Sequence, residues 1–216
     1  MSSYPIHSRN KVKRVPRNAH YDRATIYEIL DAGNLCHLGF SVEGQPFVIP
    51  TIYGRIGDRL YLHGASKSRL IKHGEGGHPI CVTVTHLDGL VLARSAFHHS
   101  MNYRSAVLFG VAKPVGAADK MRALRAISEQ LLPGRWEESR LPNAIELKAT
   151  GILELEIEQA SAKIRTGPPV DDAADCALPI WAGVVPLRQQ LGTPIPDEAL
   201  SPNIPFPQSL RDLGYC

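Results

Sequence analysis

Cysteine is scarce in this chain of 216 residues, and the four cysteines lie far apart: Cys36, Cys81, Cys176 and Cys216. Without a CxxC pair, the sequence predicts neither a disulfide framework nor a zinc-finger spacing. Cys36 and Cys81 fall within apolar strand-like runs, where a thiol serves as a small buried hydrophobic group. No apolar leader follows Met1, and no run reaches the length of a membrane helix. We therefore expect a soluble, cytoplasmic protein with no membrane partner.

Several catalytic signatures are also missing. No GxSxG elbow occurs, so a serine triad has no support. The segment HGASKSR does not match a P-loop, and no GxGxxG follows a strand. His98 and His99 are adjacent, so a strand would point them to opposite faces, and neither belongs to an HxxxH or HxH pattern. The sequence therefore predicts no metal site.

Charge is nearly balanced, with a formal net charge of +3, and the excess is local. Five cations precede the first acidic residue, Asp22: Arg9, Lys11, Lys13, Arg14 and Arg17. Such an arm can touch nucleic acid, but a solvated or partner-wrapping tail is commoner, so we expect no nucleic-acid partner. The apolar content of 44% suits one good-sized core. We expect a basic arm at 1–18, one domain at 19–185 and a proline-rich arm at 186–216.

Periodicity predicts a mainly β fold with peripheral helices. Glu43-Gly44 and Gly57-Asp58 have hairpin chemistry and separate three strands of an antiparallel meander, at 35–42, 47–53 and 60–63. Three more strands are expected at 80–85, 87–93 and 103–115, the last bending at Gly110. Six tightly linked antiparallel strands indicate a small barrel. Helices are expected at 23–32, 70–73, 117–131 and 143–148, with a final strand at 151–157.

The stretch 60–69 (LYLHGASKSR) is the first candidate binding site. A strand-like run breaks at Gly64 and opens into two hydroxyls and two cations: Ser66, Lys67, Ser68 and Arg69. Unpaired N–H groups at the start of a helix favour an anion such as phosphate. An ordinary serine-capped loop explains this stretch equally well. Nearby, Pro50 removes a ladder donor from strand 47–53, which favours a sheet edge, a bulge or a cofactor contact.

The second candidate region is 93–105 (ARSAFHHSMNYRS), which is rich in donors suited to a nucleotide-like ligand. Arg104 and Ser105 are adjacent, so a strand would point one inward and one outward, and both serve one site only through a bulge or a second subunit. Lys163 and Arg165, two residues apart, share one strand face. A solvated basic face is the favoured interpretation of that pair from spacing alone.

Three segments carry a family resemblance: LYLHGASKSR, DGLVLARSAFHHSMNYRSAVLFG, and KIRTGPPVDD followed by LPIWAGVVPL. Between about Val15 and Pro186 the chain resembles the pyridoxamine 5'-phosphate oxidase-like family, which has the FMN-binding split-barrel fold. It is most similar to the branch of flavin-nucleotide-binding proteins related to nitroimidazole-resistance proteins. The resemblance implies a six-stranded antiparallel split barrel and a homodimer, with FMN at each end of the subunit interface.

The resemblance also implies roles for individual residues. The flavin would lie along Ile49, Pro50, Thr51 and Tyr53. Its phosphate would bind at Ser66, Lys67, Ser68 and Arg69. Contacts from the other side would come from Tyr103, Arg104 and Ser105. His63 matches a position close to the cofactor, and Trp181 resembles a late aromatic that closes the site from the partner chain. Lys163 and Arg165 are further candidate cofactor contacts, and His98, His99 and Asn102 are candidates for the substrate side, where a histidine can exchange protons.

The implied activity is that of an FMN-dependent oxidoreductase acting on a small molecule, with NAD(P)H as a candidate electron donor. Oxidases of vitamin B6 metabolism end in an arginine-rich segment, whereas this chain ends in a proline-rich arm with only Arg188 and Arg211 after Trp181. This departure argues against pyridoxamine phosphate as the substrate. Two alternatives stay open: a non-catalytic flavin-binding sensor or carrier, and a haem-binding split barrel.

Overall fold

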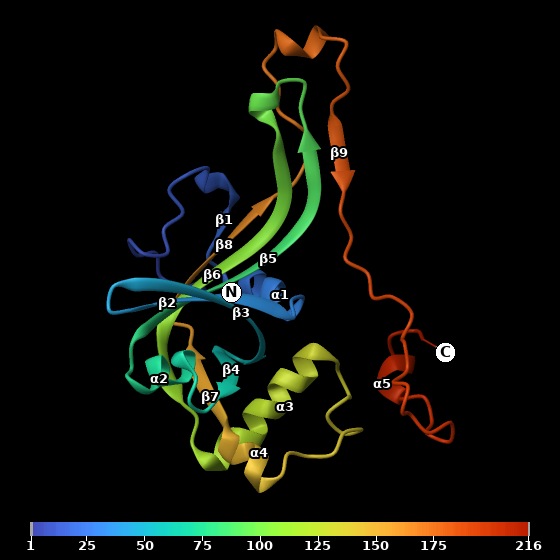
Figure 1. The fold of residues 1–216 in the computed structure, drawn as a ribbon. Coiled ribbons are helices and arrows are strands. Elements are labelled where there is room, and N and C mark those ends of the chain that lie inside the picture. The colour runs from blue at the N-terminus through green and yellow to red at the C-terminus, as the bar shows by residue number, and fades with distance from the viewer. Residues whose placement is uncertain (1, 216) are drawn as a thin grey trace.

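The computed structural model describes residues 2–215, so Cys216 lies outside the described residues. Its centre is a ring of antiparallel strands (Figure 1). Around the ring the order is β6-β7-β4-β3-β2-β5, and the pairing of β5 with β6 closes it. The six strands confirm the predicted split-barrel architecture; they are β2 (Leu35–Val42), β3 (Gln45–Ile56), β4 (Arg59–Ala65), β5 (Pro79–Leu92), β6 (Ser100–Pro114) and β7 (Thr150–Glu156).

Three further strands extend this ring. β8 (Gln159–Arg165) pairs with β6 and with the short β1 (Ala19–His20), and β9 (Gly183–Pro186) pairs with β5. The prediction that 151–157 is the last strand was therefore wrong. β9 also spans the boundary expected at 185/186, so the C-terminal arm begins as part of the sheet.

Turn chemistry sets the registers of the first hairpins. Glu43 and Gly44 have φ values of 51° and 81°, which a two-residue type I′ turn requires. In contrast, the break expected between 85 and 87 is not a turn. β5 is continuous there, and a bulge between Leu87 and Gly89 leaves Asp88 outside the ladder with β6.

Helices cover the ring from several sides. α1 (Arg23–Asp31) places Ile26, Ile29 and Leu30 in the main core, and α3 (Lys120–Leu131) packs on β3 at Gly54. A Cβ at Gly54 would lie 2.4 Å from the carbonyl carbon of Ala126, so the helix can approach only a glycine. The remaining helices are short: α2 (Arg69–Glu75), α4 (Ala144–Ala149), α5 (Gln208–Arg211), and the 3₁₀ turns η1 (Pro16–Asn18), η2 (Ala96–His98), η3 (Ala117–Asp119) and η4 (Asp175–Ala177).

One of the predicted buried cysteines belongs to the hydrophobic core. Cys36 is fully buried, and this burial raises the pKa of its thiol to about 12, so it behaves as the predicted hydrophobic group. Cys81 is only half-buried. Among the described helices, none is long and apolar enough to cross a membrane.

Gly110 is where β6 changes partners. β6 pairs with β8 as far as Phe109 and with β7 from Ala112 onward. The other half of β6 runs beyond the ring with β5 as a ribbon, and β9 lies alongside it (Figure 1). This ribbon holds the second candidate region of the sequence.

The N-terminal segment packs against the barrel instead of hanging free. The Tyr4 hydroxyl donates a 2.7 Å hydrogen bond to Asp58, and the buried Asn10 amide donates to the Ala160 carbonyl oxygen at 3.0 Å. The five cations of the arm are all exposed.

Candidate functional site

The turn that carries Ser66 to Arg69 joins β4 to α2 and is fixed by the chain's own hydrogen bonds. The Ser66 amide donates to the Ala149 carbonyl oxygen at 2.9 Å, and the Ser68 amide to that of Ala65 at 2.8 Å. Ser68 is also the N-cap of α2, because its Oγ accepts from the Ile71 amide at 3.4 Å. The turn is thus rigid, while the side chains of Lys67 and Arg69 are exposed.

A cationic cavity of about 580 Å³ lies beside this turn, and it includes both predicted cations. Lys72 of α2 adds a third, and Glu43 is the one carboxylate among the lining residues. The complete lining is Ser41, Val42, Glu43, Lys67, Arg69, Lys72, His73 and His78. Sequence reasoning missed Lys72, although its position three residues after Arg69 on a helix is a usable signal. Such an arrangement favours an anionic ligand.

Phenyl and imidazole side chains pack against one another and support the wall of the cationic cavity. Phe40 stacks on Phe47 with centroids 5.6 Å apart, and His73 follows at 4.8 Å from Phe40. The Arg69 guanidinium carbon lies 4.1 Å from the Phe47 ring centroid, a cation–π contact. His73 is also anchored, with Nε2 3.2 Å from the Pro79 carbonyl oxygen. Arg69 is therefore held in place by packing while its charge still faces solvent.

The strand predicted to lie along a flat ligand has an open edge. Pro50 pairs with His37 of β2, whereas the pairing of β3 with β4 starts only at Tyr53. This agrees with the edge position expected for Pro50. Ile49 and Thr51 are half-buried on the same stretch. Tyr53 differs from them, because it is fully buried and its hydroxyl donates to the Leu30 carbonyl oxygen at 2.5 Å.

His63 lies on β4 just before the turn and is half-buried. Its Nδ1 is buried and has no hydrogen-bond partner within the described chain. Burial lowers the pKa of the ring, which favours the neutral imidazole at neutral pH. A neutral imidazole with an unused nitrogen can accept a proton or bind a metal.

A second group of predicted residues shares one face of the sheet. In the pairing of β6 with β8, Tyr103 lies opposite Arg165 and Ser105 opposite Lys163. Directly opposed residues point to the same side of a sheet. Thus four of the predicted site residues gather on one face, and all four are half-buried.

Arg104 points to the opposite face from Ser105, as alternation predicts. It forms a bidentate pair with Asp88, with Nε–Oδ2 at 3.0 Å and Nη2–Oδ1 at 2.9 Å. Its hydrogen bonds to Asp88 raise the pKa of the guanidinium. Asp88 is the residue that the bulge excludes from the ladder, and sequence reasoning missed it although the Asp-Gly dipeptide marks the irregularity. The charge of Arg104 is therefore already balanced within the chain.

The outer end of the ribbon is tied to the loop that follows β8. The Asp171 carboxylate accepts from the Arg94 amide at 2.9 Å, from its guanidinium at 3.0 Å and from the Ser95 amide at 3.3 Å. Burial raises the pKa of Asp171, but these hydrogen bonds outweigh it and lower the pKa overall. His98 Nε2 lies 3.4 Å from Asp172 Oδ2, and His99 Nδ1 accepts from the Ala93 amide at 3.0 Å. The neutral ring of His99 therefore carries its proton on Nε2.

Asn102 was predicted to lie on the substrate side. In the structure, both its amide oxygen and its amide nitrogen form hydrogen bonds within the chain. Its Oδ1 accepts from Arg165 at 2.5 Å, and its Nδ2 donates to the Gly167 carbonyl oxygen at 3.1 Å. With 9% of its surface exposed, it positions Arg165 and the following loop. Trp181 lies just before β9 and is 65% exposed.

Besides the four residues on the face of β6 and β8, the predicted residues form two groups at different places in the chain. The turn before α2, His63 and the open edge of β3 belong to the ring, whereas His98, His99 and Asn102 lie on the outer part of the ribbon. Figure 1 shows η2 at the far tip of the ribbon and α2 on the opposite side of the molecule. Within the described residues, no group of three or more histidine, cysteine or acidic side chains is placed to hold a metal ion.

Replacing Asn102 tests its role. In Asn102→Leu, the half-buried Arg165 and Gly167 groups lose their hydrogen-bond partner, and we expect a loss of about 1–3 kcal/mol in the free energy of unfolding. Asn102→Asp keeps the Arg165 contact and should lose less. Urea unfolding checks both, with the exposed Asn203→Leu as a control that should stay within about 0.5 kcal/mol. A Leu variant as stable as this control would contradict the assignment.

Comparison with known proteins places these features in a family. A solved structure of the flavocytochrome Anf3 from Azotobacter vinelandii is 45% identical, covers 95% of this chain and 96% of its own, and superposes with a TM-score of 0.90. The FAD and heme binding protein from Mycobacterium smegmatis is 36% identical, with coverage of 90% and 96% and a TM-score of 0.87. A proposed 5-nitroimidazole antibiotic resistance protein from Bacteroides thetaiotaomicron shares the fold at 21% identity, with coverage of 68% and 86% and a TM-score of 0.56.

No curated protein sequence matches the chain. The model of the family described as pyridoxamine 5'-phosphate oxidase matches residues 22–164, a span that includes every strand of the ring. On this match, and on the two relatives above 30% identity, the chain belongs to the pyridoxamine 5'-phosphate oxidase family.

Proposed function

We propose that this protein is a flavin-dependent redox protein that also carries haem, and that it works as a homodimer. The observation that carries the proposal is the cationic cavity beside the turn before α2, next to the open edge of β3. Two relatives of 45% and 36% identity are described as a flavocytochrome and as an FAD and heme binding protein. Their coverage of nearly the whole chain supports carrying both groups over.

The residues at the cavity fit a flavin phosphate. Lys67 and Arg69 bind the phosphate oxygens, and Lys72 adds a third positive charge. A hydrogen bond to a charged group contributes about 1.5–3 kcal/mol, so the cations together account for a large part of the affinity. The sequence resemblance implied FMN. We favour FAD because the 36%-identical relative is described as binding it, and both nucleotides present a phosphate to the turn.

When bound, the flavin supplies hydride or single-electron transfer. The chain's own residues hold and orient it. The open edge of β3 around Pro50 and Thr51 offers backbone groups to the ring system. His98, which pairs with Asp172, and His99, whose Nδ1 accepts from the Ala93 amide, are the candidate groups for proton transfer on the substrate side. In this proposal they act on the flavin held by a second chain, which makes the dimer part of the proposal.

The histidines fit a haem as well. Four of the nine have a ring nitrogen in a hydrogen bond within the chain: His73, His86, His98 and His99. His63 has an unused, buried Nδ1 and a lowered pKa, so it presents the neutral form that iron requires. We therefore name His63 as the first candidate for the iron ligand.

The outer face of the sheet fits a second copy of the chain. Val48, Gly39, Cys81 and Phe109 form one row across β3, β2, β5 and β6 because each is paired with the next. Val48 is 68% exposed, and Leu35 and Leu87 on the same face are 51% and 43% exposed. These exposed apolar side chains make this face the candidate dimer interface.

The visible spectrum of the purified protein tests the cofactors. We expect a flavin band together with a Soret band, and release of FAD on denaturation. A His63→Ala variant should lose or shift the Soret band while keeping the flavin band. Absence of flavin would overturn the proposal, and release of FMN would correct its nucleotide. Flavin without turnover of NAD(P)H and small-molecule acceptors would instead favour the sensor or carrier function.

Removing the turn's cations tests the phosphate site. In the double variant Lys67→Ala and Arg69→Ala, two charge-assisted contacts are lost, so the dissociation constant for flavin should rise at least about a hundredfold. Titration of the apoprotein measures this. The matched control is Lys11→Ala with Arg14→Ala, two exposed cations of the N-terminal segment, which should leave the affinity unchanged. Equal affinities in the two double variants would remove the assignment.

Introducing a charged side chain on the outer face of the sheet tests whether that face is the dimer interface. Val48→Asp would place an unpaired carboxylate within the apolar row, so we expect the dimer dissociation constant to rise at least about a hundredfold. Analytical ultracentrifugation of the purified protein measures it. Ile145→Asp on α4, where the side chain is 80% exposed, is the control and should stay dimeric. A monomeric wild-type protein, or a dimer indifferent to Val48→Asp, would end this part of the proposal.

A further inference from the structure

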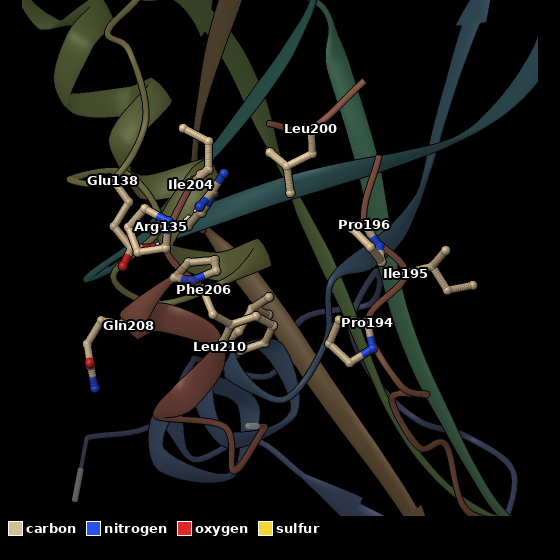
Figure 2. Close-up of a pocket in the computed structure, with 12 residues that line it drawn as sticks. Arg135, Glu138, Pro194, Ile195, Pro196, Leu200, Ile204, Phe206, Gln208 and Leu210 are labelled. Carbon is tan, nitrogen blue, oxygen red and sulfur yellow. Dashed lines mark hydrogen bonds and ion pairs between the residues drawn. The ribbon is translucent and has the colours of Figure 1, made fainter. Parts of the chain in front are cut away.

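A second cavity lies outside every residue assigned so far. It has a volume of about 700 Å³ and lies between the C-terminal arm and the loop that joins α3 to α4 (Figure 2). Its wall is mainly apolar, with Pro194, Leu200, Ile204, Phe206 and Leu210 from the arm. None of its lining residues belongs to the cationic cavity. It is therefore a separate feature of the fold.

The cavity is held in shape by a fixed anchor. Ser209 of α5 is buried, its amide donates to Glu138 Oε1 at 3.1 Å, and its hydroxyl donates to Oε2 at 2.5 Å. These hydrogen bonds lower the pKa of Glu138, so the carboxylate stays ionised at neutral pH. Prolines along the arm restrict its backbone further. A wall that is rigid before binding loses little conformational entropy when a ligand enters.

Arg135 in the cavity wall has N–H donors that its contact with Glu138 does not use. Arg135 lies 3.4 Å from Glu138 through a single nitrogen, whereas the guanidinium carries five N–H donors. Both Glu138 oxygens are already engaged with Ser209. Figure 2 shows the Arg135 guanidinium beside Ile204, on the side of the apolar wall. An occupant with an oxygen acceptor would therefore find a donor at the rim.

We propose that this cavity binds a small ring compound with an apolar body and one oxygen acceptor, either a carbonyl or a carboxylate, that pairs with Arg135. The volume lies within the range of about 300–1,000 Å³ that is usual for small-molecule sites. Leu200 and Ile204, 49% and 56% exposed, would lose apolar surface to the ligand's ring. A flavin phosphate is a poor match because Arg135 is the one cation among the lining residues, whereas a phosphate carries up to two negative charges.

Matched naphthalene probes test the proposal by calorimetry on the full-length protein with its cofactors bound. 2-Acetonaphthone carries a carbonyl, 2-naphthoate a carboxylate, and 2-ethylnaphthalene neither. We expect saturable binding of at least one of the two oxygen-bearing probes, tighter than that of 2-ethylnaphthalene. The tighter of the two identifies the acceptor group. No saturable binding of either, or equal affinity for 2-ethylnaphthalene, would overturn the proposal.

Two variants locate the binding. Arg135→Met should weaken the tighter oxygen-bearing probe by roughly ten- to a hundredfold and leave 2-ethylnaphthalene within about twofold, since only the acceptor loses its partner. Phe206→Ala should weaken all the probes that bind. The control is Arg140→Met, because Arg140 is 69% exposed, pairs with Glu146 at 2.7 Å and does not line the cavity. Wild-type affinity in both Arg135→Met and Phe206→Ala would place the probes elsewhere and sink the assignment.

Discussion

The architecture depends on how β6 is shared among its neighbours. One edge of β6 stays paired with β5, whereas the other edge changes partner, leaving β8 after Phe109 and joining β7 at Ala112. At the crossing, a Cβ on Gly110 would lie 2.4 Å from the Glu156 carbonyl oxygen. Any larger residue would push the two strands apart. The glycine thus closes the ring, and it sends the other half of β6 outward as the ribbon.

Local signals predicted most strands of the ring, but they divided β5 into two strands and did not count β7 among the six. The strand expected at 35–42 matches β2 at both ends, because alternation and a Glu-Gly turn are properties of adjacent residues. β8 and β9 were missed or misjudged since their stability comes from partners far away in sequence. β9 pairs with Gly89 to Leu92, about a hundred residues earlier, and nothing within its four residues indicates that pairing.

The site residues also divide into those that local sequence signals reveal and those that depend on distant parts of the chain. Lys67 and Arg69 were found because they lie two residues apart in one local turn. The partners that decide what the other residues can do come from elsewhere in the fold. Asp88 neutralises Arg104 only because a bulge excludes it from the ladder, and Leu30 occupies the Tyr53 hydroxyl from a helix. Burial and pairing of this kind decide whether a charged or polar group is available to a ligand, and a sequence shows neither.

Charge placement distinguishes the cavity from the N-terminal segment as the place where an anion would bind. The five cations of the N-terminal segment are exposed along a segment that packs on the barrel through Tyr4 and Asn10. By contrast, Lys67, Arg69 and Lys72 converge on one concave cavity with a single carboxylate in its wall. Cations that converge on one concave surface add their fields at one point, whereas cations spread along a segment are screened from one another over about 10 Å. The same net charge therefore favours a phosphate in the cavity over a polyanion along the surface.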